Sequence, residues 1–344
     1  MNARPSTGPD EKPGMKRRDF LSMFLAAATA LSPRTGAAQQ PERMRRVGVL
    51  LPFAENDVPA LASVKDLAQA LHRRGWTDDK NIRIDTRFAA NDPARLDAYA
   101  AELVAVSPDA LLAAIPPAVA ALRKRTGTIP IVFTYVADPV GQGIVKNLAR
   151  PGGNITGISS FDAPMMAKWL QLLKEAAPSV TRVAIIFNPD TAPYAPFLNA
   201  PVEAAAPSLG IMVTLAPAHD DEAIDKTAAD VATEPGGGII AMPDSFTTSH
   251  RNAIMAAAAR HRLPLIGLPF FTSGGGLMSY WVDAAEVQEQ AASYIDRILR
   301  GARPSDLPVQ NPTKFLLTIN LKTAKALGLT VPQSLLARAD EVIE

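Results

Sequence analysis

Short apolar runs alternate with longer stretches of helical periodicity along the whole chain after Arg46. In the longer stretches apolar residues recur at i, i+3, i+4 and i+7, as Met166, Trp169, Leu170 and Leu173 do. Strands that alternate with helices form parallel sheets with helices on both faces. The sequence therefore predicts an α/β fold with doubly wound parallel sheets. The predicted strands are Val47–Leu51, Ile82–Phe88, Ala110–Ile115, Ile129–Tyr135, Asn154–Ser159, Val183–Phe187, Met212–Ala216, Gly238–Met242, Leu263–Leu268 and Leu277–Trp281.

The predicted strands fall into two groups, which indicates two sheets. About five strands precede Ser160, and about four more follow before Pro269. Each group contains a strand with a proline near its start, Pro130 or Pro264, followed by a glycine-rich stretch. A chain of 344 residues has room for two domains of roughly 100–200 residues each. We expect two lobes joined near 157–160 and again near 276–279, with a cleft at the carboxyl ends of both sets of strands, where α/β sheets bind ligands.

The first 38 residues have the pattern of an export signal. Lys16, Arg17 and Arg18 precede the apolar run Met23–Leu31, and small residues follow at 36–38. A basic start, a short apolar core and a small-residue exit are typical of a secretory signal, and this core is too short to span a bilayer. We predict cleavage after Ala38 and export of the mature protein.

The export route and the start of the chain stay open. Arg17 and Arg18 before Phe20 resemble a twin-arginine signal, although paired arginines also occur in ordinary secretory signals. Met15 is an alternative start, because residues 1–14 have the composition of a disordered extension.

Composition excludes several kinds of partner and site. The 35 basic and 34 acidic side chains leave a net charge of +1, which provides no general attraction for nucleic acid or an anionic membrane. The absence of cysteine excludes disulfides, thiolate metal sites, cysteine nucleophiles and lipid attachment through an N-terminal cysteine.

The sequence lacks the common motifs of catalysis and cofactor binding. It contains neither a G-x-S-x-G nucleophile elbow nor a G-x-x-x-x-G-K-[ST] phosphate loop. Gly141 and Gly143 begin a pattern similar to a dinucleotide fingerprint, but Lys146 stands where the third glycine is needed. The four histidines have no cysteine or dense carboxylate cluster beside them, which argues against a metal site. We therefore expect no enzymatic activity, no cofactor and no metal.

Several segments, which follow one another in the family's order along the chain, resemble the ABC-transporter substrate-binding proteins of the tryptophan/tyrosine-type group. These proteins have the type I periplasmic-binding fold. The segments are Arg46–Leu50, Ile129–Phe133, Ala137–Gly141, Leu148–Gly157, Phe187–Asp190, Gly276–Tyr280, Leu307–Phe315 and Asn320–Leu329. The resemblance implies a soluble periplasmic receptor that delivers a small molecule to an ABC permease in the inner membrane, and we expect it to be a monomer. It also implies three chain crossings between the lobes, the third near 306–312. The lobes would then comprise residues 44–158 with 278–306, and 159–277 with 307–344.

In the first lobe the candidate ligand-binding residues lie just beyond predicted strands. Phe53 could stack on the ligand or cap the core. Tyr135 could present its hydroxyl to the ligand. Asp138 could pair with a ligand ammonium, or begin a turn with Pro139 through its own backbone.

In the second lobe two strands end in matching polar segments. Asn188 and Asp190 follow one strand and Asp244 follows another, and such residues cap the next helix or contact a ligand. Asp244 is the strongest of these candidates, followed by Ser160 and Phe246.

One segment departs from the pattern of related proteins. Ile115 and Pro116 follow the third strand, where relatives commonly carry small or hydroxyl residues. Proline has no backbone N–H, so a ligand carboxylate would lose partners here. This departure weighs against an amino acid and favours an apolar or aromatic metabolite, or a different orientation of the ligand.

Reversible capture of a small organic ligand between two lobes is therefore the predicted function, and the ligand is either amino acid-like or an apolar or aromatic metabolite. A ligand-sensing receptor subunit of the same fold, not coupled to transport, is an alternative that the sequence does not separate from import. An α/β enzyme and a regulatory domain of this fold are less favoured, because a catalytic motif and a DNA-binding helix-turn-helix are not found.

Overall fold

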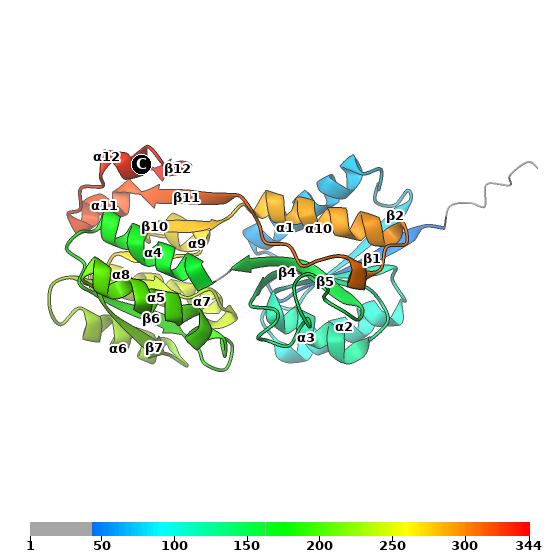
Figure 1. Cartoon of the computed structure of the whole chain (residues 1–344), viewed down its shortest axis with the longest axis horizontal. Coiled ribbons are helices and arrows are strands. Elements are labelled where there is room, and N and C mark those ends of the chain that lie inside the picture. Colours follow the sequence, from blue (N-terminus) through cyan, green and yellow to red (C-terminus); the bar gives the residue numbers. More distant parts are fainter. Residues whose placement is uncertain (1–42, 162) are drawn as a thin grey trace, which may run out of the picture. The chain divides into compact units, whose positions relative to one another are not determined.

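In the computed structural model, residues 43–161 and 163–344 are described, and they contain two sheets. The first sheet has the strand order β2-β1-β3-β4-β5, and the second has the order β12-β11-β10-β9-β8-β6-β7 (Figure 1). The predicted α/β class with two mainly parallel sheets is confirmed. The export signal predicted in residues 1–38 lies outside the described residues.

The first sheet is wholly parallel and carries helices on both faces. Helices α2 and α3 pack together on one face, where Leu103, Leu111, Leu122 and Phe133 are completely buried. Burial on both faces explains why the central strands β3 and β4 are continuous, mostly apolar runs. The elements are β1 (Arg45–Leu51), α1 (Val58–Arg73), β2 (Ile82–Phe88), α2 (Pro93–Ala105), β3 (Ala110–Ala114), α3 (Ile115–Arg125), β4 (Ile131–Ala137) and β5 (Ile155–Phe161).

The second sheet is parallel except for the antiparallel pair β10–β11. Helix α4 packs against α5, and α6 packs against α8. The elements are α4 (Ala163–Ala176), β6 (Arg182–Phe187), α5 (Ala195–Leu209), β7 (Met212–Pro217), α6 (Asp221–Val231), β8 (Gly237–Ala241), α7 (Ser245–Ser249), α8 (Arg251–Arg260), β9 (Leu265–Gly267), α9 (Pro269–Ser273), β10 (Met278–Val282), α10 (Ala284–Leu299), a 3₁₀ turn (Pro304–Asp306), β11 (Phe315–Asn320), α11 (Leu321–Leu327), α12 (Gln333–Leu336) and β12 (Glu341–Ile343).

The chain passes between the sheets three times. The first passage follows β5, and the third runs beside it, where Gln310 N donates to Gly157 O (3.1 Å) and Ser159 N to Gln310 O (2.8 Å). The second passage lies between β10 and α10, because β10 pairs with β9 and β11 while α10 packs on α1 and on strands of the first sheet. The crossing that was expected near 276–279 therefore lies a few residues later. Residues 278–306 were expected in the first lobe, but their first strand, β10, belongs to the second sheet.

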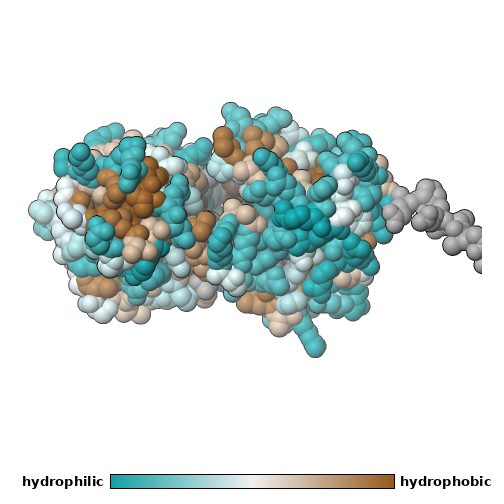
Figure 2. Space-filling model, turned by 90° about the horizontal axis from the view of Figure 1, so that it is seen from above, coloured by the Kyte–Doolittle hydropathy of each residue, from teal (hydrophilic) through white to brown (hydrophobic). Residues whose placement is uncertain are grey.

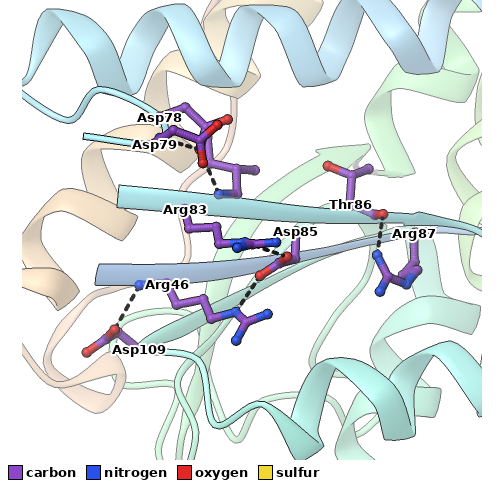
Figure 3. A network of polar contacts seen from close by, with 9 residues as sticks. Arg46, Asp78, Asp79, Arg83, Asp85, Thr86, Arg87 and Asp109 are labelled. Carbon is purple, nitrogen blue, oxygen red and sulfur yellow. Dashed lines mark hydrogen bonds and ion pairs between the residues drawn. The ribbon is translucent and has the colours of Figure 1, made fainter. Parts of the chain in front are cut away.

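A polar network surrounds the edge strand β2 of the first sheet (Figure 3). Arg46 donates from Nε to Asp85 Oδ2 and from its backbone N to Asp109 Oδ2 (2.9 Å), and Arg83 Nε donates to Asp85 Oδ1 (3.3 Å). These charges tie β2 to β1 and place ionic groups at a sheet edge, which disfavours pairing with other chains.

The surface polarity of the two sheet-bearing parts differs. In the view of Figure 2, hydrophobic residues gather on the part that carries the second sheet, while the same side of the other part is mainly hydrophilic. None of the helices in the described part of the chain combines the length and apolarity needed to cross a membrane.

Candidate ligand-binding cleft

Residues from both sheets line a cleft with a volume of about 380 Å³. Its walls include the carboxyl ends of β1, β3, β4 and β5 and the first turns of α1, α3, α7, α8 and α9. Small-molecule sites commonly occupy roughly 300–1,000 Å³. The cleft therefore has the size and the position expected for a ligand site of an α/β protein.

The walls of the cleft are mostly apolar and rich in aromatic side chains. Phe53, Phe161, Tyr194, Phe270 and Trp281 all line it. Such side chains offer flat, apolar surfaces against which a ring stacks offset or edge to face.

Two of these aromatic residues also stand at the chain crossings. The ring centroid of Phe161, at the end of β5, lies 5.5 Å from that of Trp281 and 5.7 Å from that of Trp169. Trp169 Nε1 donates to Tyr280 O (2.6 Å) and so ties α4 to β10. The aromatic cluster of Phe161, Trp169 and Trp281 thus connects the first two crossings to the cleft wall.

Two non-glycine residues at the cleft have a left-handed backbone conformation. Ile115 and Tyr135 both have φ of 57°. For a β-branched residue such as Ile115 this conformation is a genuine outlier, and strain of this kind costs about 1–3 kcal/mol and gathers at functional sites. Tyr135 lies at a β-bulge, since the register of β4 and β5 shifts between Thr134 and Val136. A bulge redirects its side chain, and here Tyr135 lines the cleft.

The Tyr135 hydroxyl belongs to a small polar group between α1 and α10. Burial raises its pKa to about 12, against the opposing effect of side-chain hydrogen bonds with Gln288 and Ser63, and the nearby Asp66 charge raises it further. The hydroxyl therefore stays protonated at neutral pH. The adjacent Thr134 hydroxyl is buried and has no hydrogen-bond partner among the described residues.

The helices that begin at the cleft have few free backbone N–H groups to offer an anion. Prolines remove some of these groups, at Pro59 in α1, Pro116 and Pro117 in α3 and Pro269 in α9. Side-chain caps use others, because Asp57 accepts from Ala60 N (3.0 Å) and Asp244 accepts from Phe246 N and Thr247 N (3.1 Å). The starts of α1, α3, α7 and α9 therefore offer a ligand carboxylate few backbone donors.

Arg251 is the only basic residue among the described residues that line the cleft. Its Nη2 lies 3.8 Å from Asp57 Oδ2, its Nη1 donates to Thr248 O (3.0 Å), and its guanidinium carbon lies 5.6 Å from the ring centroid of Phe270. Asp57 precedes α1 of the first lobe and Arg251 begins α8 of the second, so opposite charges face each other from the two lobes.

Asp244 is largely occupied by the fold around it. The buried carboxylate accepts from Asn188 N (3.3 Å), Thr191 Oγ1 (3.1 Å) and the two N–H groups of the α7 cap. Desolvation raises its pKa in spite of these hydrogen bonds. Asp244 thus lines the cleft chiefly as the cap of α7.

Six of the ten residues expected at the site line this cleft, namely Phe53, Ile115, Pro116, Tyr135, Ser160 and Asp244. The other four are not among its lining residues. Asp138 accepts from Gly141 N (2.9 Å) in a turn, and Asn188 accepts from Asp190 N (2.8 Å) in another. The Asp190 side chain is 79% exposed and pairs with His219, and Phe246 is buried in the core around α6 and α8.

Several polar lining residues that the sequence did not single out lie on helices or their caps. Asp57, Ser63 and Asp66 come from α1 and its cap, Gln288 from α10, and Arg251 from α8. The sequence contained one indication of these residues. Ser63 and Asp66 follow the helical spacing of the buried residues Ala60, Leu67 and Ala70, so they lie on the covered face of α1. No three or more His, Asp or Glu side chains in the described ranges are grouped so that they could hold a metal ion.

The chain is similar to known proteins over most of its length. It is 25% identical over 339 residues to a "Tyrosine-binding protein" of Clostridioides difficile (strain R20291), covering 92% of this chain and 94% of that one. A conserved domain protein of Vibrio cholerae O1 biovar eltor str. N16961 has a similar structure, with a TM-score of 0.79, 30% identity and coverage of 87% of this chain and 100% of that chain. The structure of an ABC domain in complex with L-Trp from Streptococcus pneumonia also has a TM-score of 0.79, at 24% identity, covering 87% and 99% of the two chains.

The family assignment comes from a match to most of the chain. The family model described as "ABC transporter substrate binding protein" matches residues 47–343. Two lobes around a cleft, with three crossings, are the architecture of type I periplasmic binding proteins, and solute-binding proteins of ABC transporters are among the structural neighbours. The resemblance found in the sequence is confirmed, and the chain belongs to the family of ABC transporter substrate-binding proteins.

Proposed function

We propose that this protein is the periplasmic solute-binding component of an ABC import system and that it binds an aromatic amino acid in the cleft. In this proposal the chain is exported, the signal is removed near Ala38, and the mature protein presents its ligand to a permease in the inner membrane. We propose that the protein acts as a monomer, in which two lobes of the same chain line the cleft. It performs no chemistry on its ligand.

The observation that most supports this proposal is that the charged side chains of Arg251 and Asp57 face each other across the cleft. An α-amino acid has a carboxylate and an ammonium on neighbouring atoms, and the two protein charges lie 3.8 Å apart on different lobes. The ligand carboxylate would bind Arg251 and the ligand ammonium would bind Asp57, with charge-assisted hydrogen bonds to each. The prolines of α3 weighed against an amino acid, but Arg251 supplies the cationic partner that the α3 backbone lacks.

The aromatic walls support an aromatic side chain on that ligand. Phe53, Phe161, Tyr194 and Trp281 all line the cleft and offer apolar faces against which a ring could pack. The relatives point in the same direction, since one is named for tyrosine binding and another was solved with L-Trp.

Ligand capture would be coupled to closure of the two lobes. A ligand favours the closed state only as far as it binds that state more tightly than the open one. A zwitterion that contacts Asp57 in one lobe and Arg251 in the other makes both contacts only when the lobes are close together. The permease then recognises the closed, ligand-bound form.

Calorimetric titration of residues 39–344 with L-tryptophan, L-tyrosine, L-phenylalanine and L-leucine tests the proposal. We expect at least one aromatic amino acid to bind, and Arg251→Met to weaken its binding by about thirtyfold, since hydrogen bonds to charged groups contribute about 1.5–3 kcal/mol. Arg260→Met is the matched control, because Arg260 lies at the other end of α8 and pairs with Asp225. No binding of any aromatic amino acid, or equal losses in the two variants, would overturn the proposal.

Import is tested separately from binding. Deletion of the gene should lower uptake of the radiolabelled ligand by whole cells, and the wild-type gene should restore it. Unchanged uptake with intact binding would favour the sensing receptor over the importer.

A further inference from the structure

Among the described residues, Asp66 is the one carboxylate lining the cleft that has no hydrogen-bond or ion-pair partner. It lines the cleft from α1, and no hydrogen bond or ion pair joins it to any of the described residues. The other two carboxylates differ, because Asp57 has Ala60 N and Arg251, and Asp244 has four donors. An ionised carboxylate is only an acceptor, so whatever occupies the space beside Asp66 must supply a donor to satisfy it.

The cleft runs along about the first three turns of α1, which places Asp66 far from the charged pair of Asp57 and Arg251. Residues from Pro59 to Leu67 contribute to the wall. Asp57 and Asp66 are nine positions apart, and a helix rises about 1.5 Å per residue, so their backbones are separated by roughly 13 Å. A ligand whose head group binds Asp57 and Arg251 would therefore approach Asp66 with the far end of its side chain.

The surroundings of Asp66 suit a polar ring edge. The Tyr135 hydroxyl is close enough for the Asp66 charge to raise its pKa, and this hydroxyl is already engaged with Ser63 and Gln288. Trp281 and Ala284 add apolar surface to the lining of the cleft. An aromatic ring that ends in a donor would contact the apolar surface and satisfy the carboxylate together.

We propose that Asp66 determines ligand specificity by accepting a hydrogen bond from a donor at the far end of the aromatic side chain, a phenol O–H or an indole N–H. This inference rests on the proposed function, because it assumes that the amino acid head group binds between Asp57 and Arg251. A site built around such a hydrogen bond rejects an analogue without the donor, since the carboxylate is then left desolvated and unpaired. The protein thus selects tyrosine or tryptophan against phenylalanine.

Calorimetry with matched ligands and variants tests this inference. The ligands are L-tyrosine, L-tryptophan, L-phenylalanine and O-methyl-L-tyrosine, in which a methyl group replaces the phenol proton. We expect wild-type protein to bind tyrosine or tryptophan at least tenfold more tightly than phenylalanine, and tyrosine at least tenfold more tightly than O-methyltyrosine if the phenol is the donor.

The Asp66 variants should remove this preference. Asp66→Leu should weaken binding of the preferred ligand at least tenfold and leave phenylalanine unchanged or stronger. Asp66→Asn has nearly the same shape as the wild-type side chain and so guards against a folding defect. Its affinity for the preferred ligand should lie between those of the wild type and Asp66→Leu. Asp97 is an exposed carboxylate of α2 that pairs with Arg125, so Asp97→Ala should leave the affinities for all of these ligands unchanged.

The outcomes separate this inference from the proposed function. If tyrosine, tryptophan and phenylalanine bind wild-type protein equally, or if Asp66→Leu weakens all of them alike, the specificity role is wrong while the aromatic amino acid receptor stands. If none of them binds wild-type protein, the proposed function fails first.

Discussion

Arg251 Nη2 lies 3.8 Å from Asp57 Oδ2, and the two residues begin helices in different lobes. The separation is long for a direct hydrogen bond and leaves both groups able to bind other charges. A zwitterionic ligand can therefore replace this weak contact between the two lobes with two stronger contacts, one to Asp57 and one to Arg251.

Removing the Asp57 charge should weaken ligand binding more than it weakens the fold. Asp57→Asn keeps a side chain that caps helices well but cannot attract an ammonium as a carboxylate does. We expect about tenfold weaker binding of the amino acid by calorimetry, with little change in thermal stability. Asp92→Asn is the control, because Asp92 caps α2 through Ala94 N (2.8 Å) and does not line the cleft. Equal affinities in the two variants would exclude Asp57 as the ammonium partner.

Loss of Asp244 should cost more stability than loss of an ordinary helix cap. Asp244→Ala leaves several donors unpaired, among them the buried Asn188 N and Thr247 N, and each unsatisfied buried group costs about 1–3 kcal/mol. Asp220→Ala removes only the exposed cap to Ala223 N (2.8 Å), worth about 1 kcal/mol. Urea unfolding should give the larger loss for Asp244→Ala. A loss no larger than that of Asp220→Ala would show that water satisfies these donors.

The Asp85 carboxylate should make the stability of the first lobe depend on acid. The side-chain hydrogen bond from Arg46 lowers the pKa of Asp85 below its usual value (Figure 3). A lowered folded-state pKa means stabilisation that is present above the unfolded-state pKa, near 3.8, and is lost as the pH falls through the folded-state value. Asp85→Asn should therefore lower Tm by a few degrees between pH 5 and 8, and this difference should shrink below about pH 4. A difference that is the same at pH 3 and pH 7 would contradict an ionic origin.

Tryptophan fluorescence should report ligand binding through one residue. Trp281 lines the cleft and lies within 6.2 Å of Trp169, centroid to centroid, whereas Trp76 bonds to Asp296 (2.7 Å) and does not line the cleft. Addition of L-tyrosine should change the emission of the wild type and of Trp76→Phe, and the change should be mostly lost in Trp281→Phe. A full response in Trp281→Phe would place the ligand away from the crossings.

Much of the site depended on helices whose position no local pattern reveals. Phe53, Tyr135 and Ser160 could be predicted, because the ends of parallel strands meet at one edge of a sheet. Asp66 and Arg251 could not, since a period of 3.6 residues shows which helix face is covered but not whether a core or a cleft covers it. Asp138 and Asn188 also follow strands, yet their side chains bond to their own turns.

The amino-acid sequence alone determined the α/β class, the two groups of strands and the family, because alternating periodicity and ordered motifs are local properties of a chain. Tertiary structure decided that β10 pairs within the second sheet, that Asp57 faces Arg251, and that Asp66 lines a cleft without a hydrogen-bond partner in the part of the chain that the structure describes. These features depend on contacts between residues far apart in the chain, such as Tyr280 with Leu317 and Asp57 with Arg251, and their geometry exists only once both lobes have packed.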